Sequence, residues 1–267
     1  MIIDTTFDFT TDSPGYWDDF WKRNDGLGYG GSDPDSVSST LKEYHRLLWS
    51  KPLPNGEMFG LKSGKGIYYL KWRDMDLSSD SIIVSFRYKK YRHMMEQVRE
   101  RVDDFESYFE NLIHRSYTIG GMIIFPAHKN SLNQSRGRSS IISDRWDLTL
   151  ECIRRYYAGE TCPLSKTIEA DKAFFDLLID FKGYVDFFFL QDCVSSDYSS
   201  VDIWLGDAAF KESGLPRTID EYFIFIDKEL AFLDKRNARI KGDPLGTGLG
   251  DQRMTRRQAN ADYYYYT

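Results

Sequence analysis

Hydrophobic residues recur at helical spacing in several long stretches of the chain. Residues 39–50 carry apolar side chains three or four positions apart, which predicts an amphipathic helix. The same spacing places four large residues on one helix face further along the chain: Trp146, Leu150, Ile153 and Tyr157. Other segments with helical character cover residues 88–115, 162–181, 184–194 and 216–239, the last opening with a Thr218–Glu221 capping box.

Shorter runs of β-branched and aromatic residues, bounded by Gly, Ser, Asp and Pro, predict strands. The strongest is "YTIGGMIIFP" (117–126), and weaker ones cover residues 57–61, 66–72, 80–86 and 200–205. Helices outweigh strands and the two do not alternate regularly, so we expect an α+β fold, mainly helical, with a small few-stranded sheet. The pattern predicts a single globular domain over residues 1–241. Residues 242–267 lack hydrophobic periodicity and are predicted to form a flexible tail.

Composition narrows the class of protein. The 267 residues carry a net charge of −6, which disfavours indiscriminate binding to nucleic acid. The three cysteines are odd in number and form no CxxC pair, so a disulfide framework is not expected. No uncharged apolar run approaches the roughly 18 residues that cross a bilayer. We therefore expect a cytoplasmic protein that does not bind a membrane.

Familiar catalytic signatures are absent from the sequence. The four histidines show no spacing typical of a metal site, and we expect no metal and no cofactor. Asp186 lies within the apolar segment "YVDFFFL", where a buried carboxylate needs a partner. We expect Asp186 to be buried and paired with an arginine, the candidates being Arg145, Arg154 and Arg155.

The segment between residues 125 and 145 holds the best candidate site. It reads as a basic, amide-rich loop between a strand and a helix, and it carries cations and amides within eleven residues: His128, Lys129, Asn130, Asn133, Gln134, Arg136 and Arg138. Such groups bind phosphate or carboxylate. The next helix carries a charged stripe that is either a solvated face or part of the site: Asp144, Asp147, Glu151 and Arg154.

Our first hypothesis is therefore a protein that binds a phosphate-bearing ligand, RNA or a nucleotide. The phosphate would be held by His128, Lys129, Asn133, Arg136 and Arg138, with Asp144 and Arg145 orienting it. If the protein is an enzyme, His128 is the candidate general acid or base. Two alternatives stay open: a non-enzymatic module that docks a protein partner, and a ribonuclease-like toxin centred on Arg87 and His93.

Four longer phrases carry a family resemblance: "YTIGGMIIFP", "NSLNQSRG", "DRWDLTLECIRRYY" and "FKGYVDFFFLQD". Together they resemble a family of bacterial proteins whose function is uncharacterised. The resemblance covers roughly residues 5–240 and leaves the C-terminal segment outside. It implies a bacterial cytoplasmic protein, and it supplies no activity, cofactor or catalytic residue.

Overall fold

The computed structural model describes residues 3–17, 33–61, 70–82, 91–203 and 210–242. At its centre lies a four-stranded antiparallel sheet in the order β1-β2-β3-β4. The strands are β1 (Gly60–Leu61), β2 (Leu70–Trp72), β3 (Met75–Ser81) and β4 (Met122–Pro126). All five residues of β4 are buried, as expected for the most apolar of these segments. The small sheet among many helices confirms the α+β prediction.

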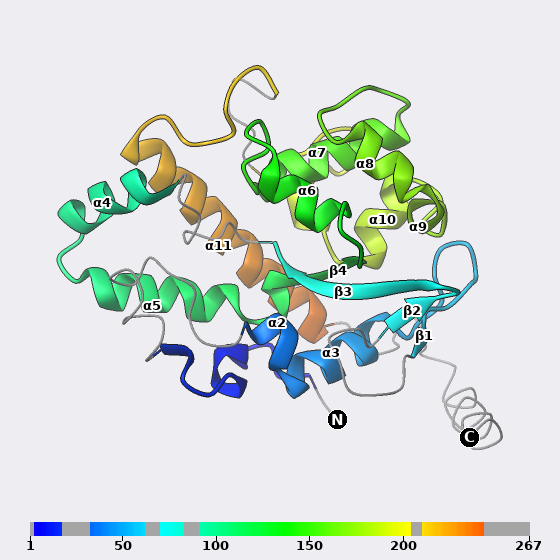
Figure 1. Ribbon diagram of the computed structural model, residues 1–267, viewed down its shortest axis with the longest axis horizontal. Helices are drawn as coiled ribbons and strands as arrows, with labels where there is room; N and C mark the ends of the chain where they lie inside the picture. Colours follow the sequence, from blue (N-terminus) through cyan, green and yellow to red (C-terminus); the bar gives the residue numbers. More distant parts are fainter. Residues whose placement is uncertain (1–2, 18–32, 62–69, 83–90, 204–209, 243–267) are drawn as a thin grey trace.

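Helices cover both sides of this sheet (Figure 1). The N-terminal part contributes η1 (Phe9–Asp12), α2 (Pro34–Val37) and α3 (Ser39–Trp49). Helix α3 begins where the Ser38 side chain accepts a hydrogen bond from the Leu41 amide at 3.0 Å, so the predicted helix over residues 39–50 is confirmed. Helix α2 packs against β3, whereas α6 (Leu132–Arg138) packs against β4.

The long helix expected between residues 88 and 115 is broken. The structure has α4 (Arg92–Arg101) and α5 (Phe105–Ser116) instead. Val102 is extended between them, and the Asp104 carboxylate accepts the Ser107 amide at 3.0 Å to begin the second helix. The N-cap therefore outweighed the continuous hydrophobic spacing that predicted one helix.

The region after α6 is also more finely divided than predicted. It contains α7 (Trp146–Tyr157), α8 (Ser165–Ala170), α9 (Lys172–Asp176), α10 (Phe181–Phe187) and η4 (Gln191–Cys193). Ile179 has a φ of 68°, which ends the helical path before Asp180 caps α10. Among the described residues of the predicted strand 200–205, Val201 forms only a single bridge to Val194.

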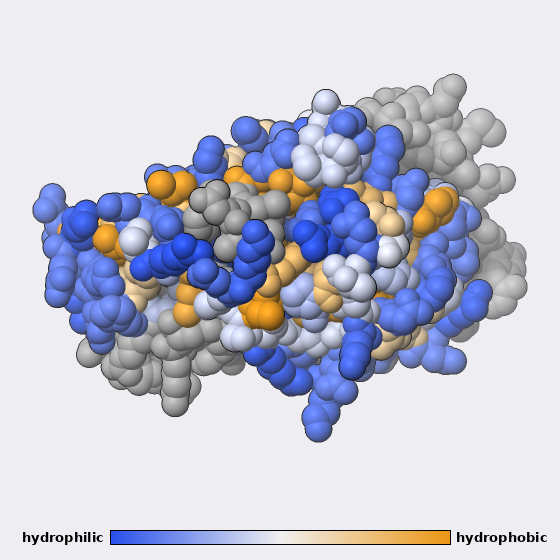
Figure 2. Space-filling view, turned by 90° about the horizontal axis from the view of Figure 1, so that it is seen from above, coloured by the Kyte–Doolittle hydropathy of each residue, from blue (hydrophilic) through white to orange (hydrophobic). Residues whose placement is uncertain are grey.

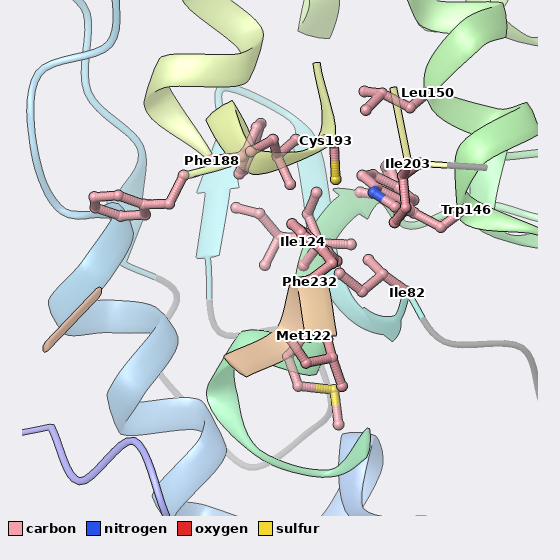
Figure 3. Packing of buried hydrophobic residues seen from close by; sticks show 14 of the residues in the cluster. Ile82, Met122, Ile124, Trp146, Leu150, Phe188, Cys193, Ile203 and Phe232 are labelled. Carbon is pink, nitrogen blue, oxygen red and sulfur yellow. The ribbon is translucent and has the colours of Figure 1, made fainter. Parts of the chain in front are cut away.

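The last element is α11 (Ile219–Gly242), which packs against α4, α5 and η4. Its predicted cap is confirmed, because Thr218 Oγ1 accepts the Glu221 amide at 3.1 Å. Figure 3 shows how Trp146 of α7, Cys193 of η4 and Phe232 of α11 gather around Ile124 of β4. The core thus joins segments from the whole described chain. Of the predicted tail, residues 242–267, Gly242 is the last residue of α11, and residues 243–267 lie outside the described residues.

Candidate functional site

The segment expected to be a loop contains a short helix. A turn at residues 127–131 follows β4, and α6 then occupies residues Leu132–Arg138. Ser131 is extended and buried, and its hydroxyl donates to the side-chain oxygen of Asn133. The helix divides the predicted site residues between the protein interior and its surface.

Arg136 lies in the interior and is fully buried. Its guanidinium donates to three backbone carbonyls, at 2.9 Å to Ser81, 3.3 Å to Ile82 and 2.7 Å to Asp144. It also pairs with the carboxylates of Asp80 and Asp144, each at 3.3 Å. Arg136 therefore fastens the end of β3 to the connection between α6 and α7. This position differs from the expected role of Arg136 and Asp144 in holding a surface ligand.

Arg145 is buried as well, immediately before α7. Its guanidinium forms a two-pronged ion pair with Asp147, whose side chain is fully buried, and it donates to the Gly214 carbonyl at 3.1 Å. Burial raises the pKa of Asp147, and the charge of Arg145 opposes that rise. Arg145 thus joins α7 to the segment preceding α11, so the expectation that it orients a surface ligand does not fit its position.

Glu229 of α11 shares this interior and was not predicted. It is 1% exposed, and neither carboxylate oxygen has a hydrogen-bond partner among the described residues. Burial raises its pKa well above the ordinary value, and the negative charge of Asp147 adds to the rise. Burial therefore favours the neutral form of the Glu229 carboxyl group over the carboxylate. The seven-residue spacing of Tyr222, Glu229 and Arg236 along the buried face of α11 is the sequence signal that could have found it.

The charged stripe of α7 is not a solvated face. Asp147 and Glu151 are both buried, at 0% and 5% exposure. Glu151 binds Arg154 at 2.8 Å and Arg155 at 2.7 Å. Burial raises the pKa of Glu151, but the hydrogen bonds from the two arginines outweigh this, and the pKa is lowered overall. Within α7, Glu151 pairs with the two arginines, whereas Asp144 and Asp147 pair with arginines that precede the helix.

The exposed half of the site lies around the turn and the outer face of α6. The His128 side chain is 44% exposed, and its Nε2 lies 2.6 Å from Oδ1 of Asp171, which is almost fully buried. Asp171 lies where α8 ends and α9 begins, so this contact ties the turn to those helices. The other ring nitrogen of His128 accepts the Asn130 amide at 3.3 Å. Both nitrogens of His128 thus serve the turn.

Lys129 and Arg138 are both exposed. Arg138 donates to the Lys129 carbonyl at 3.2 Å and to the side-chain oxygen of Gln134 at 3.1 Å. Both acceptors are neutral, and neither cation forms an ion pair within the described part of the chain. The side-chain oxygen of Asn133 caps the Gln134 amide, which leaves its NH₂ group directed to no described acceptor. These three residues retain unused donors.

Two further expectations concern residues elsewhere. Asp186 is not buried with an arginine, because its side chain is 35% exposed and it binds Lys182, Gln191 and Tyr198. Tyr198 contacts it at 2.8 Å from beyond η4. His93 is 83% exposed and lies 3.7 Å from Glu96. Its proposed partner Arg87 lies outside the described residues, so the ribonuclease alternative stays untested.

The described residues contain no group of three or more His, Cys, Asp or Glu side chains arranged to hold a metal ion. They also contain no helix with the length and hydrophobicity needed to span a membrane. The site therefore consists of the exposed donors on the turn and α6, supported from below by buried ion pairs.

Comparison with protein families gives one match. The model of a family of unknown function, DUF6994, matches residues 3–240. The chain belongs to this family. The match covers nearly the same residues as the resemblance noted in the sequence. Comparisons with curated proteins and with solved structures found no match.

Proposed function

We propose that this member of DUF6994 binds a phosphate-bearing ligand, RNA or a nucleotide, on the exposed face formed by Lys129, Asn133 and Arg138. The observation that carries the proposal is that the Arg138 guanidinium lies against the Lys129 carbonyl and that neither cation pairs with a described carboxylate, on a protein of net charge −6. Charge-assisted hydrogen bonds from arginine and lysine are strong contacts for phosphate oxygens.

The surroundings of these residues support the proposal. Asp171 and His128 fix the turn on one side, and the buried Arg136 fixes α6 on the other. Donors held on a rigid support lose little freedom when a ligand binds, which favours affinity. Figure 2 looks onto the top of the molecule as drawn in Figure 1, where α6 lies above β3, and shows many hydrophilic residues on this side with apolar residues among them.

His128 contributes to the proposed site by holding the turn in its conformation. Its ring nitrogens contact Asp171 and the Asn130 amide, so proton transfer to a ligand would require the turn to open. We therefore propose binding as the function. The cytoplasmic location and bacterial origin expected from the sequence stay proposals, with the three free cysteines supporting a reducing compartment.

The test is a titration of the intact protein with a nucleoside triphosphate, a single-stranded RNA oligonucleotide and inorganic phosphate, each at two salt concentrations. The double variant Lys129→Gln/Arg138→Gln should lose affinity, because each lost charge-assisted hydrogen bond costs about 1.5–3 kcal/mol. If the ligand is RNA, affinity should also fall steeply as salt rises.

The matched control removes the same charge from another exposed surface. Lys228 and Lys235 are exposed on α11 and form no ion pair among the described residues, so Lys228→Gln/Lys235→Gln should bind like wild type. Equal binding by the two double variants would contradict the proposal. No binding of any probe by the wild-type protein at low salt would also contradict it, and would leave protein docking as the alternative.

A further inference from the structure

Cys162 lies in the connection between α7 and α8, and a local turn fixes its position. Its amide donates to the Ser165 hydroxyl at 2.8 Å, at the beginning of α8. The turn lets the Cys162 thiol donate to the carbonyl oxygen of Cys152, in the middle of α7, at 3.6 Å. Cys162 is half-buried, whereas Cys152 is fully buried beneath it.

Three donors surround the Cys162 sulfur. The Ser165 hydroxyl reaches it at 3.4 Å, and the Cys152 thiol and the Leu164 amide also form hydrogen bonds to it. Donors aimed at a sulfur stabilise the thiolate over the thiol. The hydrogen bond from Cys152 is the main reason that the pKa of Cys162 is lowered to about 6; burial opposes it, and Ser165 and Arg155 add to it.

The other two cysteines have opposite surroundings. Burial raises the pKa of the Cys152 thiol, and the hydrogen bond that it gives to Cys162 raises it further. Burial also raises the pKa of Cys193 well above the ordinary value. In the core, Cys193 lies beside Trp146 (Figure 3). The surroundings of Cys162 therefore favour its thiolate, those of Cys152 favour its thiol, and Cys193 is buried in the core.

We propose that Cys162 is a site of reversible oxidation, where a hydroperoxide oxidises its thiolate and the Cys152 thiol then captures the product as an intramolecular disulfide. The thiolate attacks the terminal peroxide oxygen, the O–O bond breaks, and Cys162 becomes a sulfenic acid while the departing hydroxide or alkoxide takes up a proton. The Cys152 sulfur then forms the S–S bond. The Cys162 S–O bond breaks, and hydroxide leaves with the Cys152 proton as water.

The fold is suited to this cross-link. The disulfide would join the middle of α7 to the start of α8 and would close only the short segment from residue 152 to residue 162. Since α8 packs against α6, oxidation would act on an element next to the proposed ligand surface. The oxidation site does not depend on that surface, and its chemistry can be tested separately.

The first measurement uses the reduced wild-type protein and needs no variant. It is treated with hydrogen peroxide at pH 7, blocked with N-ethylmaleimide after unfolding, and analysed by peptide mass spectrometry. We expect a Cys152–Cys162 cross-link, two hydrogens lighter than the reduced pair, with Cys193 alkylated. Three alkylated cysteines, or Cys162 oxidised to sulfinic acid with Cys152 still alkylated, would overturn the proposal.

The second measurement follows the rate of Cys162 alkylation by iodoacetamide as a function of pH. The rate should reach half its maximum near pH 6, the pKa of Cys162, whereas an ordinary thiol does so near pH ~8.5. In Cys152→Ala the midpoint should move upward, because the main donor is lost. A wild-type midpoint above pH 8 would refute the thiolate assignment.

Cys193→Ser is the matched control, since Cys193 has no part in the proposed reaction. This variant should form the cross-link at the wild-type rate, and Cys162→Ser should form none. A cross-link in Cys162→Ser that involves Cys193 would overturn the proposal. Circular dichroism of each reduced variant shows whether the fold is retained, and the wild-type measurements stand if a variant fails to fold.

Discussion

Two arginines of the same short helix, Arg136 and Arg138, have opposite environments. Arg136 is fully buried and contacts three backbone carbonyls and two carboxylates, whereas Arg138 is exposed and contacts only neutral oxygens. A helix turns about 100° per residue, so side chains two positions apart point in nearly opposite directions. Cations that are neighbours in the sequence can therefore have different roles when the segment forms a helix: one is buried and stabilises the fold, and the other is exposed on the surface.

The largest expected effect is on the buried arginine. Arg136→Met should lower the free energy of unfolding by about 3–5 kcal/mol, because Asp144, Asp80 and several carbonyls lose their buried partner. Urea denaturation followed by circular dichroism measures this loss. A variant as stable as wild type would show that Arg136 does not support the fold.

An intermediate effect is expected at Glu229. Its folded-state pKa is raised above the ordinary value near 4.5, so above that pH the unfolded chain releases a proton that the folded protein keeps. The contribution of Glu229 to the free energy of unfolding therefore falls as pH rises. The fall is at most about 1.4 kcal/mol per pH unit and ends once the pH passes the pKa of Glu229 in the folded protein.

Glu229→Gln removes this titration, so its stability relative to wild type should increase between pH 5 and pH 8 for as long as the folded wild-type protein keeps the Glu229 proton. Thermal unfolding of both proteins across that range is the measurement. Parallel stability curves would mean that Glu229 ionises normally in the folded protein. Asp171, whose pKa burial also raises, is common to both proteins and cancels in the difference.

The smallest expected effect completes the comparison. Arg138→Met makes the same substitution as Arg136→Met two positions later, and it should change the free energy of unfolding by less than about 0.5 kcal/mol. The same urea denaturation measures it. A loss close to that of Arg136→Met would remove the distinction between the two residues and place Arg138 among the supports.

The sequence predicted some parts of the molecule better than others, for physical reasons. The fold class, α3 and the capping box of α11 followed from local hydrophobic spacing and local caps. The break between α4 and α5 was missed because hydrophobic spacing continues across it, while the chain is extended at Val102.

The candidate site was harder to predict, because burial of a charged residue depends on distant segments. Arg136 contacts carbonyls at the end of β3, more than fifty residues earlier, and Arg145 contacts Gly214, almost seventy residues later. No local pattern contains those partners. For Asp186 the apolar neighbours suggested burial, but they face the core while the carboxylate faces Lys182 and Tyr198.

Arg236 has a consequence for how the protein is made. Buried on α11, it donates to the carbonyls of Gly120 and Met122 at 2.8 Å and of Phe188 at 3.1 Å, and burial lowers its pKa to about 10. Ribosomes synthesise α11 after all these acceptors. A nascent chain that has not yet extended past residue 236 therefore lacks the donor for the carbonyls of Gly120, Met122 and Phe188, and the core is completed only when α11 emerges.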